Sequence, residues 1–194
     1  MTLEAEISKA DVNKLPLGEF TGTTHLIDTV EALEKALEQM APHPILGFDT
    51  ETRPAFKKGV SYPISLLQFA SADEAWLIRL NKTGFPEELA KFLERDQIKV
   101  GVAVKNDVVG LQKLHDFDGK YIVDLSTIAK NNKLVSQGLR PLMAICHGVR
   151  ISKGAKISNW AAETLNNGQI RYAATDAWAG FKIYEKFVAE GFKV

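Results

Sequence analysis

Short apolar runs alternate with segments of helical period along this chain, and this alternation constrains its fold more than any other feature. The runs expected to form strands cover residues 45–48, 64–70, 75–80, 98–104 and 121–123. A short polar link between the second and third runs predicts an antiparallel hairpin, while helical segments separate the later runs. Hairpin and crossover connections together predict an α/β fold, with one mixed five-stranded sheet flanked by helices.

Apolar residues at helical spacing predict the helices that join these strands. Asp28-Thr-Val-Glu31 resembles a capping box and Pro42 follows it, so one helix is expected over about residues 29–40. The others are expected over 87–95, 106–115, 125–131 and 138–147, as a short helix from Ser158, and over 167–190. Residues 1–22 lack a clear period, and we interpret them as a peripheral arm before a single domain at residues 23–194.

The composition is that of a globular chain and argues against a disordered or membrane-spanning one. Of the 194 residues, 45% are hydrophobic and 25% are charged, and no apolar run is long enough to cross a bilayer. A single cysteine, Cys146, excludes an intrachain disulfide and a cysteine-rich zinc site. The first residues are polar and acidic, without the apolar core of a signal peptide. We therefore expect a cytoplasmic protein without a membrane partner.

Acidic and basic residues balance at 24 each, but they are segregated along the chain. Residues 1–44 hold eight acids and three bases, while residues 130–171 hold seven bases against Glu163 alone. Such clustering fits either solvated faces or a basic surface for a polyanion. The choice between them depends on which residues lie beside the basic segment.

Two acids close the first apolar run, in Gly47-Phe-Asp49-Thr-Glu51. Side chains at positions i and i+2 of a strand point to the same face, so both carboxylates would lie together. They would lie at the carboxyl end of the strand, where open α/β sheets bind ligands. A cation is one reason to keep like charges together. The alternative is that Asp49 caps the following loop and Glu51 is simply exposed.

Three further acids are candidates. Asp107 and Asp124 each follow an expected strand, although acids are also favoured at the start of a helix, and Asp124 fits an N-cap. In Tyr172-Ala-Ala-Thr-Asp176 the tyrosine and the aspartate share a helix face, where they either serve one site or pack. The chain contains no Walker A loop, GxGxxG, GxSxG, HExxH or CxxC motif. The acids therefore remain the main candidates for chemistry.

Taken in order, these segments resemble the tyrosine branch of the DEDD superfamily of 3′–5′ exonucleases, which includes the Werner-syndrome exonuclease domain and the ribonuclease D catalytic domain. The three family motifs are similar to Phe48-Asp49-Thr-Glu51, to residues 100–111, which include Asp107, and to Tyr172-Ala-Ala-Thr-Asp176-Ala. Arg171 stands where the histidine branch has its histidine, so Tyr172 identifies the tyrosine branch. The resemblance runs from about residue 45 to residue 187.

This resemblance implies a ribonuclease H-like fold and a hydrolase that releases nucleoside 5′-monophosphates from the 3′ end of nucleic acid. It implies two Mg²⁺ or Mn²⁺ ions held by Asp49, Glu51, Asp107 and Asp176. It also implies that Tyr172 orients the attacking water and the scissile phosphate. The expected substrate is single-stranded or recessed, with DNA slightly favoured over RNA. The alternative is a catalytically silent module of the same fold that binds nucleic acid or protein.

Basic residues near these motifs are the candidate substrate contacts. They are Lys57, Lys58, Lys153, Lys156 and Arg171. Trp160 fits either base stacking or a core position, and its Ser-Asn-Trp setting favours the core. The basic segment 130–171 then becomes an approach surface for a polyanion, and we expect binding to weaken as salt rises.

Overall fold

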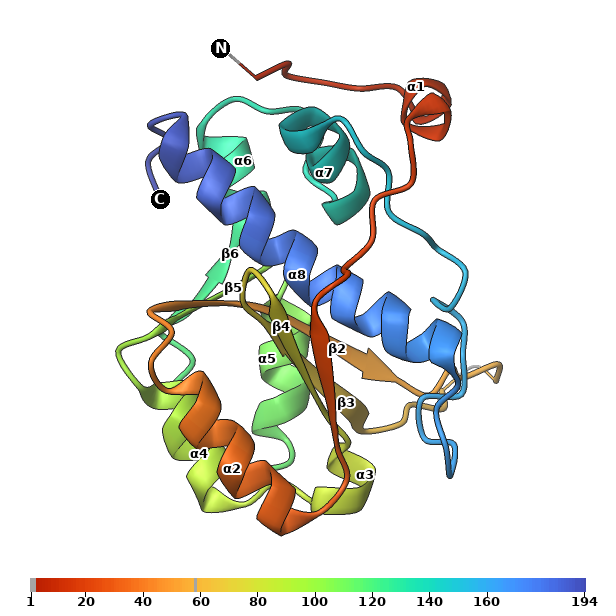
Figure 1. Ribbon diagram of the computed structural model, residues 1–194, viewed down its shortest axis with the longest axis vertical. Coiled ribbons are helices and arrows are strands. Elements are labelled where there is room, and N and C mark those ends of the chain that lie inside the picture. The colour runs from red at the N-terminus through yellow and green to blue at the C-terminus, as the bar shows by residue number, and fades with distance from the viewer. Residues whose placement is uncertain (1–2, 58) are drawn as a thin grey trace.

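A six-stranded mixed sheet runs through the computed structural model, which describes residues 3–57 and 59–194 (Figure 1). In spatial order its strands are β1 Thr23–Ile27, β4 Glu74–Ile78, β3 Ile64–Ala70, β2 Ile45–Thr52, β5 Ile98–Gly101 and β6 Ile122–Asp124. β3 is antiparallel to β2 and to β4, and the other neighbours pair in parallel. The predicted α/β class and the predicted hairpin of β3 and β4 are confirmed.

β1 is the strand that the apolar pattern misses, so the predicted number of five strands was one too low. It lies at the edge of the sheet and pairs with β4 from Thr23 to Ile27. Among its residues only Ile27 is buried. An edge strand with one buried side chain has neither the alternation nor the continuous apolar run by which strands are predicted.

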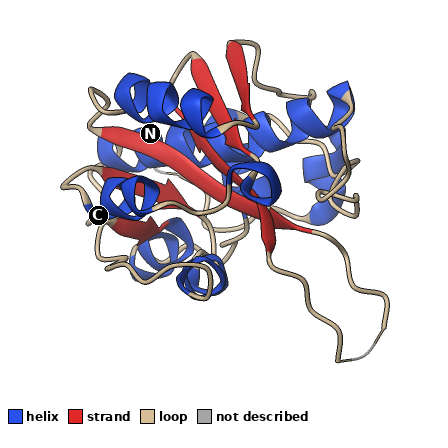
Figure 2. Cartoon of the chain, turned by 90° about the horizontal axis from the view of Figure 1, so that it is seen from below, coloured by secondary structure: helices blue, strands red, loops and turns tan. Residues whose placement is uncertain are grey.

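Helices cover both faces of the sheet (Figures 1 and 2). They are α1 Lys9–Lys14, α2 Val30–Met40, α3 Leu80–Thr83, α4 Glu87–Glu94, α5 Lys105–Gln112, α6 Leu125–Asn131, α7 Leu139–His147 and α8 Asn167–Ala189. The long helix α8 crosses one face, with α6 and α7 packed against it, and α2, α4 and α5 lie on the other. Within the described residues no helix is long and apolar enough to span a membrane.

Two predicted elements differ from the structure. The run at 98–104 ends as a strand at Gly101, because Ala103 adopts a left-handed conformation with φ 60° and donates its backbone N–H to Asp124 over 2.9 Å. The helix expected from Ser158 is replaced by turns, in which Trp160 N–H donates to the Ser158 carbonyl over 3.0 Å. A hydrogen bond to a distant residue at Ala103, and short-range backbone hydrogen bonds after Ser158, override the apolar pattern.

Residues 3–22 run over the surface of the molecule, through α1, to the start of β1 (Figure 1). Val12 and Phe20 are buried there. Gly18 N–H donates to the Arg150 carbonyl over 2.8 Å, and Arg150 N–H donates to the Pro16 carbonyl over 2.9 Å. These bonds attach the arm to the loop that follows α7.

Close packing of α8 on β2 depends on a glycine. A Cβ atom at Gly47 would lie only 1.9 Å from the carbonyl oxygen of Ala177, so no other residue fits there. Ala173 and Ala177, both fully buried, present small side chains from the helix. Because the backbones approach this closely, the α8 residue next to Ala177, Asp176, comes beside the acids of β2.

Candidate active site

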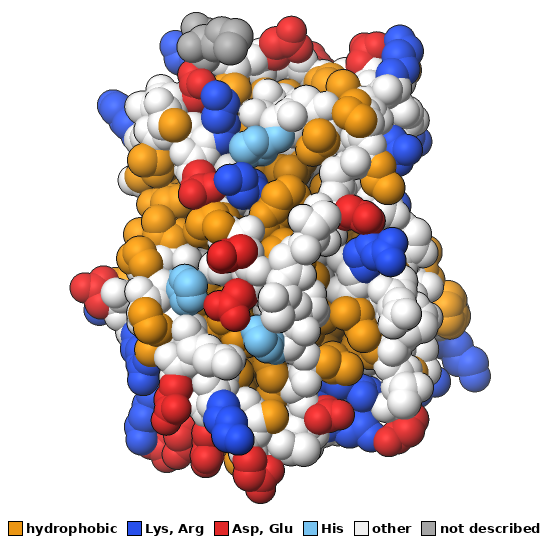
Figure 3. Space-filling model, viewed as in Figure 1, with side chains coloured by type: hydrophobic (Ala, Val, Ile, Leu, Met, Phe, Trp, Pro, Cys, Tyr) orange, Lys and Arg blue, Asp and Glu red, His pale blue; other side chains and the backbone are white. Residues whose placement is uncertain are grey.

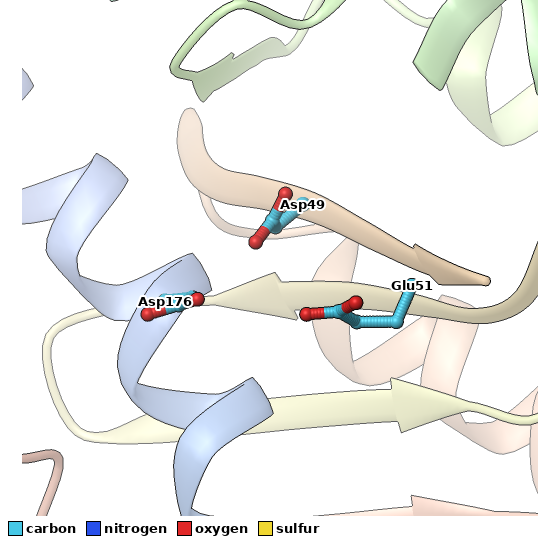
Figure 4. Close-up of side chains that lie close together, drawn as sticks. All are labelled: Asp49, Glu51 and Asp176. Atoms are coloured by element: carbon cyan, nitrogen blue, oxygen red, sulfur yellow. The ribbon is translucent and has the colours of Figure 1, made fainter. Parts of the chain in front are cut away.

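Three carboxylates from two elements meet on the α8 face of the sheet. Asp49 and Glu51 lie within β2 and point to the same side, and Asp176 faces them from α8 (Figure 4). Each offers one oxygen, and these oxygens all lie within 4.8 Å of one another. Asp176 is buried, and the other two are partly buried.

The edge of β2 beside these acids is open because its neighbour β5 is short. The pairing of β2 with β5 ends where Gly47 faces Val100, whereas β2 continues to Thr52. Beyond this point the chain turns at Ala103 and begins α5. The early end of β5 leaves a cleft of about 770 Å³ that the carboxylates line.

Asp107 lies in the first turn of α5 and lines the same cleft. It is not one of the three residues whose oxygens lie within 4.8 Å of one another. The Thr50 hydroxyl donates a hydrogen bond to its carboxylate. Thr50 alternates with Asp49 and Glu51 along β2, so it faces the other side of the sheet. Thr50 was not predicted as a site residue, although the alternation of side chains along β2 indicates its orientation.

Tyr172 lies one helical turn before Asp176, and the two side chains are hydrogen-bonded. Burial and the charge of Asp176 raise the pKa of the Tyr172 hydroxyl, so it stays protonated at neutral pH. Its ring contacts that of Trp160, with 5.9 Å between the ring centroids. Trp160 is completely buried, which confirms the core position that its setting predicts.

The carboxylates hold protons unusually strongly. Burial, together with Asp176 and Glu51, raises the pKa of Asp49 well above its usual range. Burial and the charges of Asp176 and Asp107 raise the pKa of Glu51 to about 8. Burial raises the pKa of Asp176 to about 7, although Tyr172 and Lys156 oppose the shift. These groups have too little positive charge around them, which a bound cation would supply.

Only part of the predicted substrate contacts lie at the cleft. Lys153 and Lys156 line it, and Lys156 lowers the pKa of both Glu51 and Asp176. Arg171 lines a neighbouring hollow instead and lies 3.7 Å from a carboxylate oxygen of Glu19. Lys57 lines another hollow, which does not include the carboxylates. Lys58 lies outside the described residues.

The charge segregation of the sequence does not produce a face of one sign in Figure 3, where basic and acidic side chains intermingle.

Asp124, one of the candidate acids, has a structural role as a helix cap. Its carboxylate accepts the Ser126 N–H over 2.8 Å and caps α6. The N-cap interpretation of Asp124 is therefore confirmed.

Clustered carboxylates beside a protonated tyrosine, in a cleft with lysines, have the chemistry to bind divalent cations and phosphate esters. A family model described as 3′-5′ exonuclease matches residues 24–191. The chain belongs to this 3′–5′ exonuclease family.

Individual relatives agree with this assignment. The chain is 32% identical over 190 residues to the mouse bifunctional 3′-5′ exonuclease/ATP-dependent helicase WRN, an alignment that covers 90% of this chain and 13% of that protein. The chain spans about half or less of the length of the curated relatives that it matches.

Solved structures show the same fold. The Nibbler EXO domain of Aedes aegypti matches with a TM-score of 0.80 at 24% identity, over 91% of this chain and 95% of that one. The Trypanosoma brucei RNase D complex with RNA U12 matches with a TM-score of 0.76 at 16% identity, over 87% of this chain and 63% of that one. These neighbours confirm the ribonuclease H-like architecture.

Proposed function

We propose that this chain is a metal-dependent 3′–5′ exonuclease that removes nucleoside 5′-monophosphates from the 3′ end of nucleic acid. The observation that supports this proposal most strongly is the group of three carboxylates whose oxygens lie within 4.8 Å of one another, Asp49, Glu51 and Asp176. The same cleft holds Tyr172 and Lys156. Membership of the exonuclease family supports the reaction class.

The donor set fits hard divalent cations. Carboxylate oxygens are the ligands that Mg²⁺ and Mn²⁺ prefer, and the raised pKa values of Asp49 and Glu51 reflect negative charge that lacks a partner. We assign two such ions to Asp49, Glu51, Asp107 and Asp176. When bound, they would supply the positive charge that makes a water nucleophilic and stabilises the departing 3′ oxygen.

The chain's own groups orient the reaction. The Tyr172 hydroxyl remains protonated, because burial and Asp176 raise its pKa. Its single proton goes to Asp176 in the structure, and once cations bind that carboxylate the hydroxyl would be free to donate to the attacking water or to the scissile phosphate. Lys153 and Lys156 contact the phosphates of the bound strand. The Thr50 hydroxyl donates to the Asp107 carboxylate, which also lines the cleft, and so fixes its position. Water adds to phosphorus while the bond to the preceding 3′ oxygen breaks, and that oxygen leaves with a proton.

The proposed substrate is a single-stranded or recessed 3′ end, with DNA slightly favoured over RNA. This preference rests on the resemblance to the Werner-syndrome exonuclease domain, and the chain is 32% identical over 190 residues to the mouse WRN protein. Matched DNA and RNA oligonucleotides, digested side by side, test the order of preference. Faster digestion of the RNA would reverse it.

The Asp49→Asn variant tests the reaction. Without this carboxylate the metal-dependent release of mononucleotides from a 3′-labelled oligonucleotide should fall by ~10³-fold, because the charge that holds the cations is reduced. Circular dichroism should show an intact fold. The control is Asp116→Asn, which changes an exposed aspartate remote from the cleft and should leave the rate unchanged. Undiminished digestion by Asp49→Asn would refute the assignment.

A further inference from the structure

The carboxylates lie between two hollows, and the proposed reaction uses only one of them. The second hollow has a volume of about 550 Å³, within the range of small-ligand sites. It shares Thr50, Glu51 and Asp107 with the cleft described above. From these residues it extends over the other side of the acids, to Tyr62 and Lys113.

Tyr62 stands where this hollow meets two others. It lies at the base of the β2–β3 connection, which reaches away from the sheet in Figure 2. Tyr62 is 39% exposed, although the strand that follows it is buried. The Arg53 guanidinium lies over its ring, 4.9 Å from the centroid. The Tyr62 hydroxyl has no hydrogen-bond partner among the described residues.

The surroundings of Tyr62 combine three kinds of group. Pro63, Ile64 and Leu114 provide apolar surface. Arg53 and Lys113 provide positive charge, and neither forms an ion pair within the described part of the chain. An aromatic ring, apolar surface and unpaired cations beside a phosphodiester-cleaving site match the chemistry of a nucleotide, which has a flat base and an anionic phosphate.

We propose that this second hollow binds an unpaired nucleobase next to the scissile phosphate, with the base stacked on Tyr62 and a phosphate near Lys113. The proposal rests on the proposed function. A phosphodiester joins two nucleosides. When its phosphate lies over Glu51 and Asp107, one nucleoside therefore lies in the cleft and the other in the second hollow. Stacking requires a base with a free face, and the hollow therefore selects single-stranded 3′ ends over paired ones.

Binding to oligonucleotides tests this inference without catalysis. Two 5′-fluorescein dodecathymidylates are compared by fluorescence anisotropy in Ca²⁺ buffer, one intact and one with abasic sites at its last two positions. Tyr62→Ala should weaken binding of the intact strand about tenfold and leave binding of the abasic strand within twofold. Tyr62→Phe should bind like the wild type, because the ring is retained.

A matched pair elsewhere on the molecule provides the control. Lys120 lies over the ring of Tyr121, 4.7 Å from the centroid, and neither residue lines the described cleft or hollows. Tyr121→Ala should therefore bind both strands like the wild type. An equal loss for intact and abasic strands in Tyr62→Ala, or no loss for either, would overturn the stacking role.

Mononucleotide release in Mg²⁺ separates this inference from the proposed function. If the wild-type protein shows the base-dependent binding but releases no nucleotide, the base-binding role of the hollow is supported and the exonuclease assignment is refuted. If the wild-type protein digests oligonucleotides and Tyr62→Ala binds them normally, the exonuclease assignment is supported and the base-binding role of the hollow is refuted.

Discussion

The acids of the candidate site and the ammonium group of Lys99 are both removed from water, but on opposite faces of the sheet. Lys99 is completely buried. Its Nζ donates to the carbonyls of Phe92 over 2.9 Å and of Leu93 and Arg95 over 3.2 Å each, at the end of α4. All three protons of the ammonium group thus have an acceptor among the carbonyls at the end of the helix.

The acidic cluster contrasts with this arrangement. Asp49, Glu51 and Asp176 face one another, and burial together with mutual repulsion raises the pKa of Asp49 and Glu51. Hydrogen bonds offset most of the cost of burying the Lys99 charge, whereas buried charges that repel one another reduce stability unless a ligand binds. Lys99 is therefore a structural group and the acids are a binding site. Asp49→Asn is accordingly expected to lose activity without losing stability, and changes at Lys99 should do the reverse.

The largest effect on stability is expected for Lys99→Met. The substitution keeps the apolar stem but removes the Nζ donor from three buried carbonyl groups, of which those of Phe92 and Arg95 keep a backbone donor. The expected cost is about 1–3 kcal/mol in the free energy of unfolding. Urea denaturation measures this change, and nucleotide release below the melting temperature should be unaffected. Lys35→Met, at an exposed position of α2, should change stability by no more than about 0.5 kcal/mol. Equal free energies of unfolding for the two variants would contradict the structural role of Lys99.

The pH dependence of stability should reveal the burial and mutual repulsion of the acids. Burial and neighbouring charge raise the pKa of Glu51 to about 8, and burial raises that of Asp176 to about 7. The folded protein binds protons here that the unfolded chain releases near pH 4, so stability should fall as pH rises from about 4 to about 8. Lys99 acts in the opposite direction only above about pH 8, the value to which burial lowers its pKa.

Thermal melting without divalent ions, between pH 5 and pH 8, measures this decline. Mn²⁺ should raise the melting temperature more at pH 8 than at pH 6, because cations bind the deprotonated acids. In Asp49→Asn both the decline and the Mn²⁺ effect should be smaller. A melting temperature that is flat with pH and insensitive to Mn²⁺ would contradict the contrast with Lys99.

The smallest effects are expected among the basic residues. Lys156 lines the cleft and acts on Glu51 and Asp176, whereas Arg171 faces Glu19 outside it. Lys156→Ala should weaken oligonucleotide binding several-fold and reduce the slope of log affinity against log salt by about 0.7–1. Arg171→Ala should change neither by more than about twofold. A larger loss of affinity for Arg171→Ala than for Lys156→Ala would show that the nucleic-acid strand does not run through the cleft.

Most elements were predictable because their apolar residues face a continuous core. The strands at 64–70 and 75–80, nearly all of whose residues are buried, illustrate this. β1 was missed because an edge strand buries little. The turn at Ala103 is stabilised by a hydrogen bond to Asp124, which no local pattern reveals. The turns after Ser158 are closed by short-range backbone hydrogen bonds, which the apolar pattern does not predict.

The acids of the candidate site were likewise identifiable in advance. Asp49 and Glu51 alternate along a strand, and Tyr172 and Asp176 share a helix face, so short-range geometry places each pair. The bond from Thr50 to Asp107 and the ion pair of Arg171 with Glu19 were not predicted, since each joins residues far apart in the chain.

The amino-acid order thus specifies which chemical groups this protein carries and which of them are local neighbours, because strand and helix periods are properties of the backbone. How those pairs combine is a property of packing. Gly47 admits the backbone of α8, and the early end of β5 opens the edge of β2. Contacts between segments distant in sequence therefore bring four acids to one cleft and leave Tyr62 exposed beside them.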